Sequence, residues 1–312
     1  MGEASAANLP IIDLLASDKV STAATLRKAC IDVGFFYIVN HGIDKELLKR
    51  LFEESERFFA LPLEEKMKLK RKEVELTGYT PLYSEKLDHS LTTKGDPKES
   101  INIGPLHDSM CHENQWPSEE LLPNWRPTIE EYHRKILSTG KSLLSLLALS
   151  VNLDEGYFEN LGALDPAMPM LRLLHYPGDK NYHNEEVLGA SAHSDYGMLT
   201  ILATDGVPGL QVCREKDRQP RIWQDVLDIE GALIVNIGDM FERLTNCLFR
   251  STLHRVLPRG TERYSVALFL DIRYDFTVEC LETCCSESNP PRFPPIRVID
   301  YLKQRFELAY GA

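Results

Sequence analysis

The chain has 312 residues, 43% of them hydrophobic and 26% charged, which is the balance of a folded globular protein rather than of a disordered or fibrous one. Its formal net charge of -12 at pH 7 repels polyanions, so nucleic acids and acidic membranes are excluded as expected partners and a small organic molecule is favoured. No run of about eighteen apolar residues predicts a membrane-spanning helix, and an odd count of seven cysteines fits reduced thiols in the cytoplasm better than a disulfide framework.

The opening third of the chain predicts short strands and helices. Residues 8–14 (NLPIIDL) are apolar with a proline near their head, and they predict a short strand. A helical pattern follows, and residues 34–43 (GFFYIVNHGI) then predict a buried strand because aromatic and β-branched residues dominate. Asp44 is the expected N-cap of an amphipathic helix, which Pro62 ends.

The middle of the chain predicts loops and then one long helix. Residues 70–127 carry mixed charges, several glycines and prolines and little periodicity, which indicates long loops with short strands. Thr128 and Glu131 form a T-x-x-E capping box, so a long helix with one apolar stripe is expected to begin there. We expect this helix to be the structural backbone of the domain.

From Met168 onward the pattern changes to short β-forming runs separated by turn signals. Strands at this spacing predict a sandwich or a barrel. A proline-rich segment and a final helix from Val298 follow. The expected fold class is therefore α+β, mainly β. The runs read LRLLHY, LTILAT, GLQVC, ALIVNIG, STLHRVL and YSVALFLDI.

Two residues of the segment SAHSDYG are candidate metal ligands. His193 and Asp195 are two positions apart, and in extended backbone positions i and i+2 project to the same side. An H-x-D motif alone is a weak signal, because such spacings arise by chance and histidines often have structural roles.

A third candidate ligand, His254, lies in the later β-like run STLHRVL. Two histidines and one carboxylate on one face leave other coordination positions of a metal open. That arrangement suits ferrous iron, which must bind a co-substrate and O2 together, whereas structural zinc closes its shell with four protein ligands. Cys280, Cys284 and Cys285 are a much weaker metal candidate, because no histidine follows them and adjacent cysteines make a poor tetrahedral pair.

An arginine and a serine further along the chain predict an anion site. Arg263 and Ser265 are again two positions apart on a predicted strand, so both side chains point into the same interior. A buried guanidinium fits a carboxylate with two parallel hydrogen bonds, and no acidic residue of that strand face precedes Asp271. The alternative is an arginine that reaches solvent at a strand end.

These segments together resemble the plant-type 2-oxoglutarate and Fe(II)-dependent dioxygenase superfamily, which includes isopenicillin N synthase-like enzymes. The resemblance covers nearly the whole chain, and the segments occur in the family order. They are LPIIDL, GFFYIVNHGI, FFALPLEEK, LRLLHYPG, AHSDYGMLTIL, GLQV, VNIGDMFERLTN, LHRV, RYSVALF and FPPIRVIDYLKQRF.

The resemblance implies a double-stranded β-helix, or jelly-roll, core flanked by N-terminal helices and a long central helix. Residues 1–100 are then expected to form an N-terminal region of helices and strands that packs on the core. Residues 101–312 are expected to form the jelly-roll core with the C-terminal helix. Loops at about residues 76–106, together with that helix, are expected to cover the mouth of the barrel and to supply specificity.

The resemblance also assigns roles to the candidate residues. It implies that the H-x-D pair and the distal histidine hold Fe(II), and that Arg263 and Ser265 grip the distal carboxylate of 2-oxoglutarate. Tyr176 matches a tyrosine that contacts the same co-substrate. Leu174 departs from the family, which often has asparagine there, so one polar contact to 2-oxoglutarate is expected to be missing. Cys247 also departs, where many members have glycine.

The reaction implied is the oxidation of a small molecule by O2, with 2-oxoglutarate converted to succinate and CO2 and with ascorbate as a candidate reductant. Hydroxylation is the leading expectation, ahead of desaturation or demethylation. A same-fold oxidase that does not use 2-oxoglutarate and a non-catalytic binding protein or receptor are the alternatives. Nucleic-acid demethylases with a similar motif are disfavoured by the negative charge.

The organic substrate is expected to be an apolar or aromatic metabolite of the plant type, such as a hormone, flavonoid, alkaloid or coumarin precursor. Tyr79, Phe241 and Phe269 are candidate pocket residues, although each aromatic side chain fits a structural core equally well. We expect a monomer or a weak oligomer.

Overall fold

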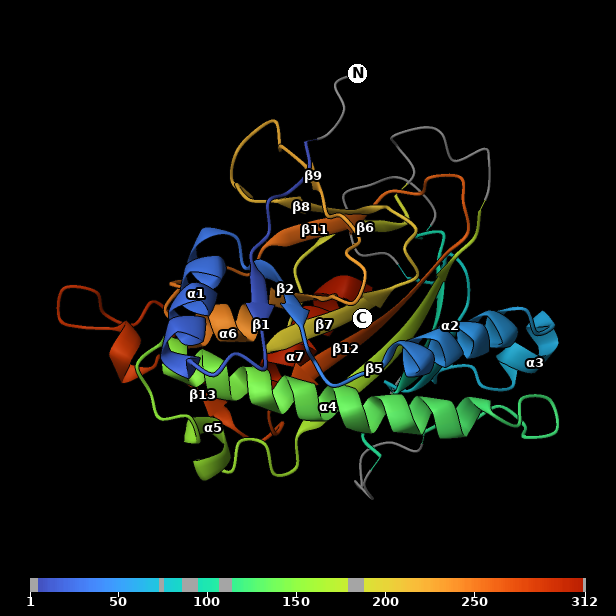
Figure 1. The fold of residues 1–312 in the computed structure, drawn as a ribbon, viewed down its shortest axis with the longest axis horizontal. Coiled ribbons are helices and arrows are strands. Elements are labelled where there is room, and N and C mark those ends of the chain that lie inside the picture. Colours follow the sequence, from blue (N-terminus) through green and yellow to red (C-terminus); the bar gives the residue numbers. More distant parts are fainter. Residues whose placement is uncertain (1–4, 73–75, 86–94, 107–113, 179–187, 311–312) are drawn as a thin grey trace.

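Two main β-sheets and a layer of helices make up the core of the described fold (Figure 1). The structure, a computed structural model, describes residues 5–72, 76–85, 95–106, 114–178 and 188–310. In Figure 1 the smaller sheet lies above the larger one, and the long helix α4 (Trp125–Ser150) lies along the opposite side of the larger sheet. Within the described residues, no helix is long and apolar enough to cross a bilayer.

The larger sheet has eight strands, and all neighbours pair antiparallel except the first two. The smaller sheet has four strands, and a third sheet has two. In spatial order the larger sheet is β1 (Ile11–Asp13), β2 (Phe35–Val39), β10 (Leu233–Ile237), β7 (Leu199–Thr204), β12 (Arg263–Asp271), β5 (Met168–Tyr176), β4 (Glu99–Ile103) and β3 (Gly78–Thr80). The smaller sheet is β6 (Ala190–His193), β11 (Leu253–Val256), β8 (Leu210–Cys213) and β9 (Gln224–Asp225), and the third is β13 (Thr277–Val278) with β14 (Ile296–Arg297).

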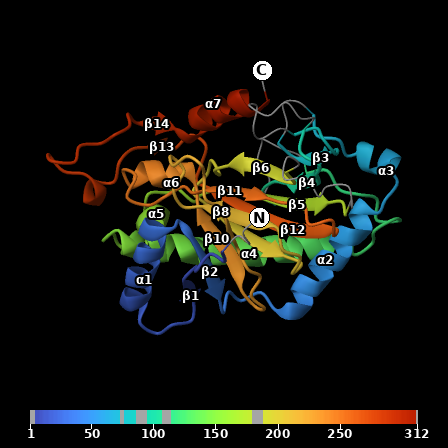
Figure 2. The same ribbon diagram turned by 90° about the horizontal axis from the view of Figure 1, so that it is seen from above.

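The helices surround these sheets. α1 and α2 lie beside α4, while Figure 2 shows α7 at one edge of the layered core. This arrangement confirms the expected jelly-roll core with flanking helices. Besides α4, the helices are α1 (Lys19–Asp32), α2 (Lys45–Phe59), α3 (Leu63–Met67), α5 (Tyr157–Asn160), α6 (Asp239–Leu244), α7 (Val298–Tyr310) and the short 3-10 helix η1 (Glu282–Cys284).

The predicted helix starts are right in one case and wrong in another. Asp44 caps α2 as expected, since its Oδ1 accepts a hydrogen bond of 2.8 Å from the backbone N–H of Leu47. α4, however, begins at Trp125, so Thr128 lies inside the helix and the predicted capping box is wrong. Pro127 is tolerated there because backbone N–H groups of a first turn have no helical partner.

The core has two parts, one on each side of the larger sheet. The main cluster joins that sheet to the helices and includes Trp125 and Ile129 of α4. A side chain at Gly140 of α4 would place its Cβ only 2.7 Å from Leu270, so glycine lets the helix approach β12 closely. The second cluster includes Leu174 and Val212, from the two different sheets.

The larger sheet crosses the predicted division between residues 1–100 and 101–312. That division falls inside β4, and β1, β2 and β3 from the N-terminal part belong to the same sheet as β5, β7, β10 and β12. The N-terminal residues therefore extend the core sheet as well as packing helices against it.

Candidate metal centre and the adjoining cavity

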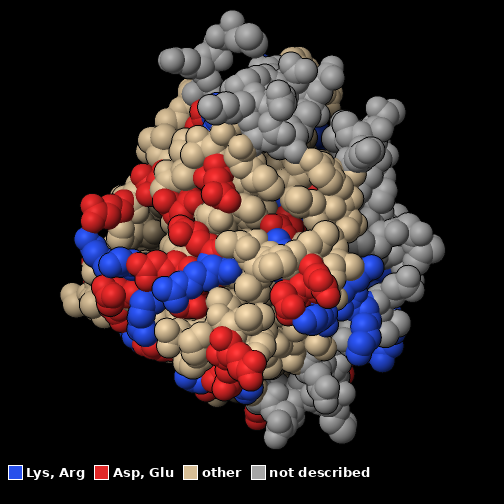
Figure 3. All heavy atoms as spheres, turned by 90° about the vertical axis from the view of Figure 1, so that its right-hand side faces the viewer, with Lys and Arg blue, Asp and Glu red and all other residues tan. Residues whose placement is uncertain are grey.

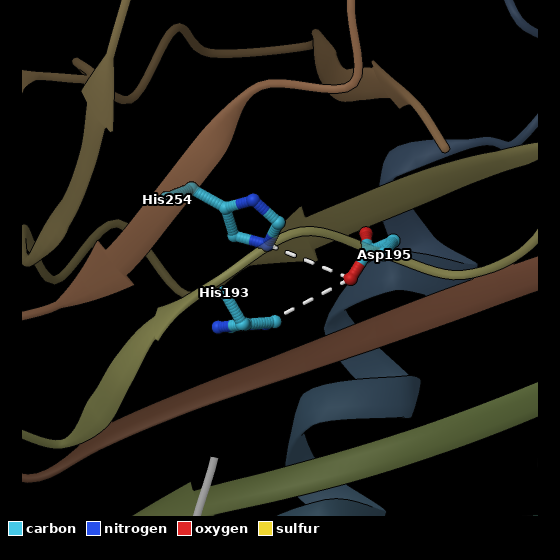
Figure 4. A group of neighbouring side chains, drawn as sticks. All are labelled: His193, Asp195 and His254. Atoms are coloured by element: carbon cyan, nitrogen blue, oxygen red, sulfur yellow. Dashed lines mark ion pairs between the residues drawn. The ribbon is translucent and has the colours of Figure 1, made fainter. Parts of the chain in front are cut away.

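His193, Asp195 and His254 converge on one point (Figure 4). His193 ends β6 and His254 lies on the neighbouring strand β11, where the two residues are cross-strand partners. The Oδ1 atom of Asp195 lies 3.7 Å from Nε2 of His193 and 3.6 Å from Nε2 of His254. Donor atoms bound to one ion at about 2.1 Å lie between ~3 Å and ~4.2 Å apart, so these distances fit a shared metal.

Hydrogen bonds turn the three ligand atoms toward that point. Each histidine uses Nδ1 to donate to a backbone carbonyl, at 2.7 Å to Ser191 for His193 and 3.1 Å to Thr252 for His254. These bonds fix the tautomer that leaves the Nε2 lone pairs available for a metal. This polarity is the one that a metal-binding histidine requires.

The Asp195 carboxylate is held in the same way. Its Oδ2 accepts hydrogen bonds from Thr200 Oγ1 at 2.5 Å and from Asn236 Nδ2 at 2.7 Å. One oxygen is thus satisfied by protein donors, and Oδ1 remains directed at the two imidazoles. Sequence reasoning missed both supporting residues, although Asn236 belongs to the segment VNIGD that carries part of the family resemblance.

The electrostatics of the three residues favour a bound cation. Burial lowers the pKa of His193 to about 4, and the neighbouring His254 acts in the same direction. Burial alone raises the pKa of Asp195, but the two imidazoles and the hydrogen bonds from Thr200 and Asn236 outweigh it and bring the pKa below its usual value. A pKa lowered at the His193 imidazole and at the Asp195 carboxyl favours the deprotonated forms that metal ligands need.

The ligand set fits ferrous iron. Two imidazoles and one carboxylate on one face are the arrangement of non-haem Fe(II) oxygenases, which leaves positions open for co-substrate and O2. Across the described residues, this triad is the one group of histidine, cysteine and acidic side chains positioned to hold a metal ion. Cys280, Cys284 and Cys285 are free thiols outside it.

Alternate residues of β5 and β12 form one wall of the cavity beside the triad. Side chains at every second position of a strand face the same side, and the two strands are antiparallel neighbours. The wall therefore consists of cross-strand pairs. These are Arg263 with Tyr176, Ser265 with Leu174, Ala267 with Arg172, Phe269 with Met170, and Asp271 with Met168.

Arg263 is buried at one end of this wall, with 3% of its surface exposed. Its Nε donates to the carbonyl of Val207 and its Nη1 to Ser265 Oγ, each at 3.1 Å. The guanidinium also lies 5.1 Å from the centre of the Tyr176 ring. Among the described residues no carboxylate forms an ion pair with it, so the geometry leaves a buried cation that an anionic ligand can neutralise.

The structure thus brings six predicted residues to one cavity: the triad, Arg263, Ser265 and Tyr176. Leu174 lies opposite Ser265 and offers the cavity an apolar side chain, so no polar contact comes from this position.

Only one of the three predicted pocket aromatics lines the cavity. Phe269 does so, and the guanidinium of Arg172 lies 5.5 Å from its ring centre. Tyr79 and Phe241 are instead buried in the main core, Tyr79 against Phe58 and Phe241 stacked with a second phenylalanine. The expectation that Tyr79 and Phe241 line the pocket is therefore corrected. Both large aromatic side chains are buried by packing in the core and do not face the cavity.

A buried ionic group that sequence reasoning missed also lines the cavity. Lys98 Nζ lies 2.7 Å from Asp96 and 3.1 Å from Glu85, and Glu85 also pairs with Arg172 at 3.2 Å. The buried Asp96 accepts hydrogen bonds from Ser191, two residues before the first histidine ligand. Hydrogen bonds therefore connect this ionic group to β6, the strand that bears His193.

Asp271, at the far end of the wall, was also missed. It continues the alternation of β12 by which Arg263 and Ser265 were recognised, so the same spacing could have identified it. Its Oδ1 is buried and has no hydrogen-bond partner among the described residues. Burial raises the pKa of this carboxyl to about 7, and the nearby Asp195 adds to the effect.

One face of the molecule carries charged side chains of both signs (Figure 3). On the described part of the face in Figure 3, basic side chains alternate with acidic ones rather than forming a continuous positive area. Nucleic-acid binding uses such positive areas.

Two family models match the chain. Residues 9–119 match the N-terminal region described as "non-haem dioxygenase in morphine synthesis", and residues 167–272 match the 2OG-Fe(II) oxygenase superfamily. Kihadalactone A synthase LFS of Citrus sinensis is 39% identical over 308 residues, covering 96% of this chain and 91% of the relative. The 2-oxoglutarate-Fe(II) type oxidoreductase hxnY of Emericella nidulans is 34% identical over 309 residues, with 94% and 86% covered.

A solved structure gives the same result. A full-length Neurospora crassa protein, solved in complex with alpha-KG, which is 2-oxoglutarate, superimposes with a TM-score of 0.85 and 28% identity, covering 99% of both chains. The second matched segment ends just beyond Asp271 and contains all three triad residues together with Arg263 and Ser265.

Proposed function

Since the chain belongs to the 2-oxoglutarate- and Fe(II)-dependent oxygenase superfamily, we propose that it hydroxylates a C–H bond of a small organic metabolite and releases succinate and CO2. The observation that supports this most is the juxtaposition, in one cavity, of a three-ligand metal centre and a buried arginine without a carboxylate partner among the described residues.

The geometry supports the following roles. His193, Asp195 and His254 hold Fe(II), which when bound supplies the oxidation chemistry with O2 and 2-oxoglutarate. Arg263 binds the distal carboxylate of 2-oxoglutarate through its free N–H groups. The hydroxyl of Ser265, 3.1 Å from that guanidinium, assists the same carboxylate. The keto-acid end of the co-substrate then lies toward the triad.

Tyr176 completes this end of the cavity. Its ring lies against the guanidinium of Arg263, so it keeps the arginine in place and excludes water from the ion pair. The absence of a polar side chain at Leu174 makes binding of 2-oxoglutarate more dependent on Arg263.

The other end of the wall suggests the chemistry of the organic substrate. Met168, Met170 and Phe269 offer apolar contacts, and Asp271 adds one buried carboxyl whose Oδ1 has no partner within the described part of the chain. A buried polar atom without a partner is costly, so a ligand that supplies a hydrogen bond is favoured there. We propose an apolar metabolite with one hydroxyl or N–H group directed at Asp271.

The main rival is an oxidase of the same fold that does not use 2-oxoglutarate. Such an enzyme has no need for a buried arginine that faces the metal cavity and pairs with no described carboxylate. A non-catalytic binding protein is disfavoured by the hydrogen bonds that hold the three ligand atoms for a metal. Ascorbate is proposed as an accessory reductant that keeps the iron ferrous.

A metabolite screen by mass spectrometry tests the function. The purified protein is incubated with Fe(II), ascorbate and a library of apolar metabolites, with and without 2-oxoglutarate. We expect a product that gains one oxygen atom, and an equal amount of succinate, only when 2-oxoglutarate and O2 are both present. A product formed equally without 2-oxoglutarate supports the oxidase instead.

The proposed functional unit is a single chain in a reducing compartment such as the cytoplasm. All residues assigned above come from one chain, so a monomer or weak oligomer suffices, and size-exclusion chromatography of the active protein measures this. The six described cysteines are free, which suits a compartment that keeps iron ferrous.

A further inference from the structure

A cluster of acidic and basic side chains, buried except at Glu262, lies behind the co-substrate end of the cavity, on the opposite face of the larger sheet. Tyr176 faces the cavity, so its neighbour His175 on β5 faces the helices, where its ring lies 5.3 Å from that of Phe59. The cluster comprises Lys66, Tyr79, Glu99, His175, Glu262 and Tyr264.

His175 bridges two carboxylates. Its Nδ1 lies 2.7 Å from Glu99 Oε1, and its Nε2 lies 2.7 Å from Glu262 Oε1. The two contacts use both ring nitrogens, so the imidazole joins Glu99 to Glu262.

Two other residues of the cluster hold the buried acid, Glu99. Lys66 Nζ donates to Glu99 Oε2 at 2.8 Å, and the hydroxyl of Tyr79 donates to the same oxygen. Burial raises the pKa of Glu99, but the hydrogen bonds from His175, Lys66 and Tyr79 outweigh it and leave the pKa below its usual value. Glu99 is therefore an ionised anchor inside the protein.

The bridge joins three strands at the point where the anion site is built. Glu99 of β4 is the cross-strand partner of His175, and on the other side His175 is paired with Tyr264 of β12, whose ring stacks on it at 4.8 Å. Glu262 directly precedes Arg263, which is itself the partner of Tyr176. Tyr176, next to His175 on β5, and Arg263, next to Glu262 at the start of β12, are thus the two residues proposed to face 2-oxoglutarate.

We propose that His175 is a positioning residue for the co-substrate. Its bridge between Glu99 and Glu262 holds the ends of β5 and β12 together. Tyr176 and Arg263 then meet 2-oxoglutarate in the correct geometry. This inference rests on the proposed function, because it takes Arg263 as the anchor of the carboxylate. A displacement of about 1 Å at a binding residue is enough to weaken its contribution strongly.

Glu262 allows the bridge to be cut without disturbing the core. Its side chain is 55% exposed, whereas His175 and Glu99 are buried. An exposed ion pair contributes little to the free energy of unfolding, so Glu262→Ala is expected to fold normally. Glu215 provides a matched control, because its side chain is 60% exposed and pairs with Arg218 away from the cavity.

The experiment measures the dissociation constants of Mn(II), used in place of Fe(II), and of 2-oxoglutarate by calorimetry without O2. The proteins compared are the wild type, Glu262→Ala, Glu262→Gln, His175→Gln, Glu215→Ala and Arg263→Ala. We expect Glu262→Ala and His175→Gln to weaken 2-oxoglutarate binding roughly 5- to 20-fold and to leave Mn(II) binding unchanged, a loss of about 1 to 2 kcal/mol. Glu262→Gln keeps an acceptor for the imidazole and should recover most of the affinity. Glu215→Ala should match the wild type.

Two results separate the proposals. Wild-type affinity for 2-oxoglutarate in Glu262→Ala, alongside a large loss in Arg263→Ala, overturns the positioning role of His175 and leaves the anchor intact. Unchanged affinity in Arg263→Ala overturns the anchor assignment on which both proposals depend. An equal loss of Mn(II) and 2-oxoglutarate binding in Glu262→Ala also contradicts the inference, because a general structural defect then explains it.

Discussion

Replacement of Arg263 by alanine is the sharpest single perturbation of the co-substrate site. Arg263 is 3% exposed, and its guanidinium donates from Nε to Val207 and from Nη1 to Ser265, which are its hydrogen bonds within the described residues. Its removal leaves a bound carboxylate buried without a cation, which costs ~3 to 5 kcal/mol for a broken buried pair. At 1.4 kcal/mol per factor of ten, affinity for 2-oxoglutarate should fall roughly a hundredfold to a few thousandfold.

Calorimetric titration of the Mn(II)-loaded protein with 2-oxoglutarate measures this loss directly. Arg263→Lys keeps the charge and loses the planar two-pronged contact, so its affinity should lie between those of the wild type and Arg263→Ala. Arg259→Ala is the control, since Arg259 is partly exposed and pairs with Asp225. Mn(II) binding should be unchanged in all three variants. A loss below about fivefold in Arg263→Ala refutes the assignment of this arginine as the anchor.

Three further predictions concern metal affinity, pH and stability. Asn236→Ala removes the 2.7 Å hydrogen bond to Asp195 and should weaken Mn(II) binding about 10- to 100-fold in a calorimetric titration. Asp271→Asn should stabilise the metal-free protein, and the gain should grow as pH rises. Burial raises the pKa of this carboxyl from 3.8 to about 7, so ionisation of Asp271 lowers the free energy of unfolding of the wild type by up to ~4 kcal/mol between these pH values. Thermal unfolding at pH 5 and pH 8 measures the difference. Asp44→Ala removes the cap on Leu47 and should lower the free energy of unfolding in urea by ~1 kcal/mol.

Each of these predictions has a contradicting outcome. Unchanged Mn(II) affinity in Asn236→Ala means that the orientation of the Asp195 carboxylate does not depend on this amide. Equal stabilisation by Asp271→Asn at pH 5 and pH 8 means that the buried carboxyl does not titrate in this range. An unaltered urea midpoint in Asp44→Ala means that the Asp44 cap of α2 does not contribute to the free energy of unfolding.

The candidate site was predictable because its signals are local. Period-two spacing brought His193 together with Asp195 and Arg263 together with Ser265, and each pair lies on the same side in the structure. Convergence of the two pairs on one cavity required pairing between distant strands, which no spacing within a single segment reveals. The family resemblance supplied that step.

The predictions for the start of α4 and for two pocket aromatics were wrong for different physical reasons. A helix start depends on which residue first adopts helical backbone, and α4 begins three residues before the capping box at Thr128. Aromatic residues fit a core and a ligand pocket equally well, so the sequence could not separate Tyr79 and Phe241, which are core residues, from Phe269. The bridge at His175 joins residues from three strands and was likewise invisible in the sequence.

A crystal structure obtained without O2, with Fe(II) and 2-oxoglutarate bound and anomalous data collected at the iron edge, examines the metal and anion sites in one measurement. We predict a single strong anomalous peak bonded to Nε2 of His193, Nε2 of His254 and Oδ1 of Asp195, with the distal carboxylate of 2-oxoglutarate paired to the guanidinium of Arg263. An anomalous peak at other residues, or a co-substrate carboxylate turned away from Arg263, would contradict the account.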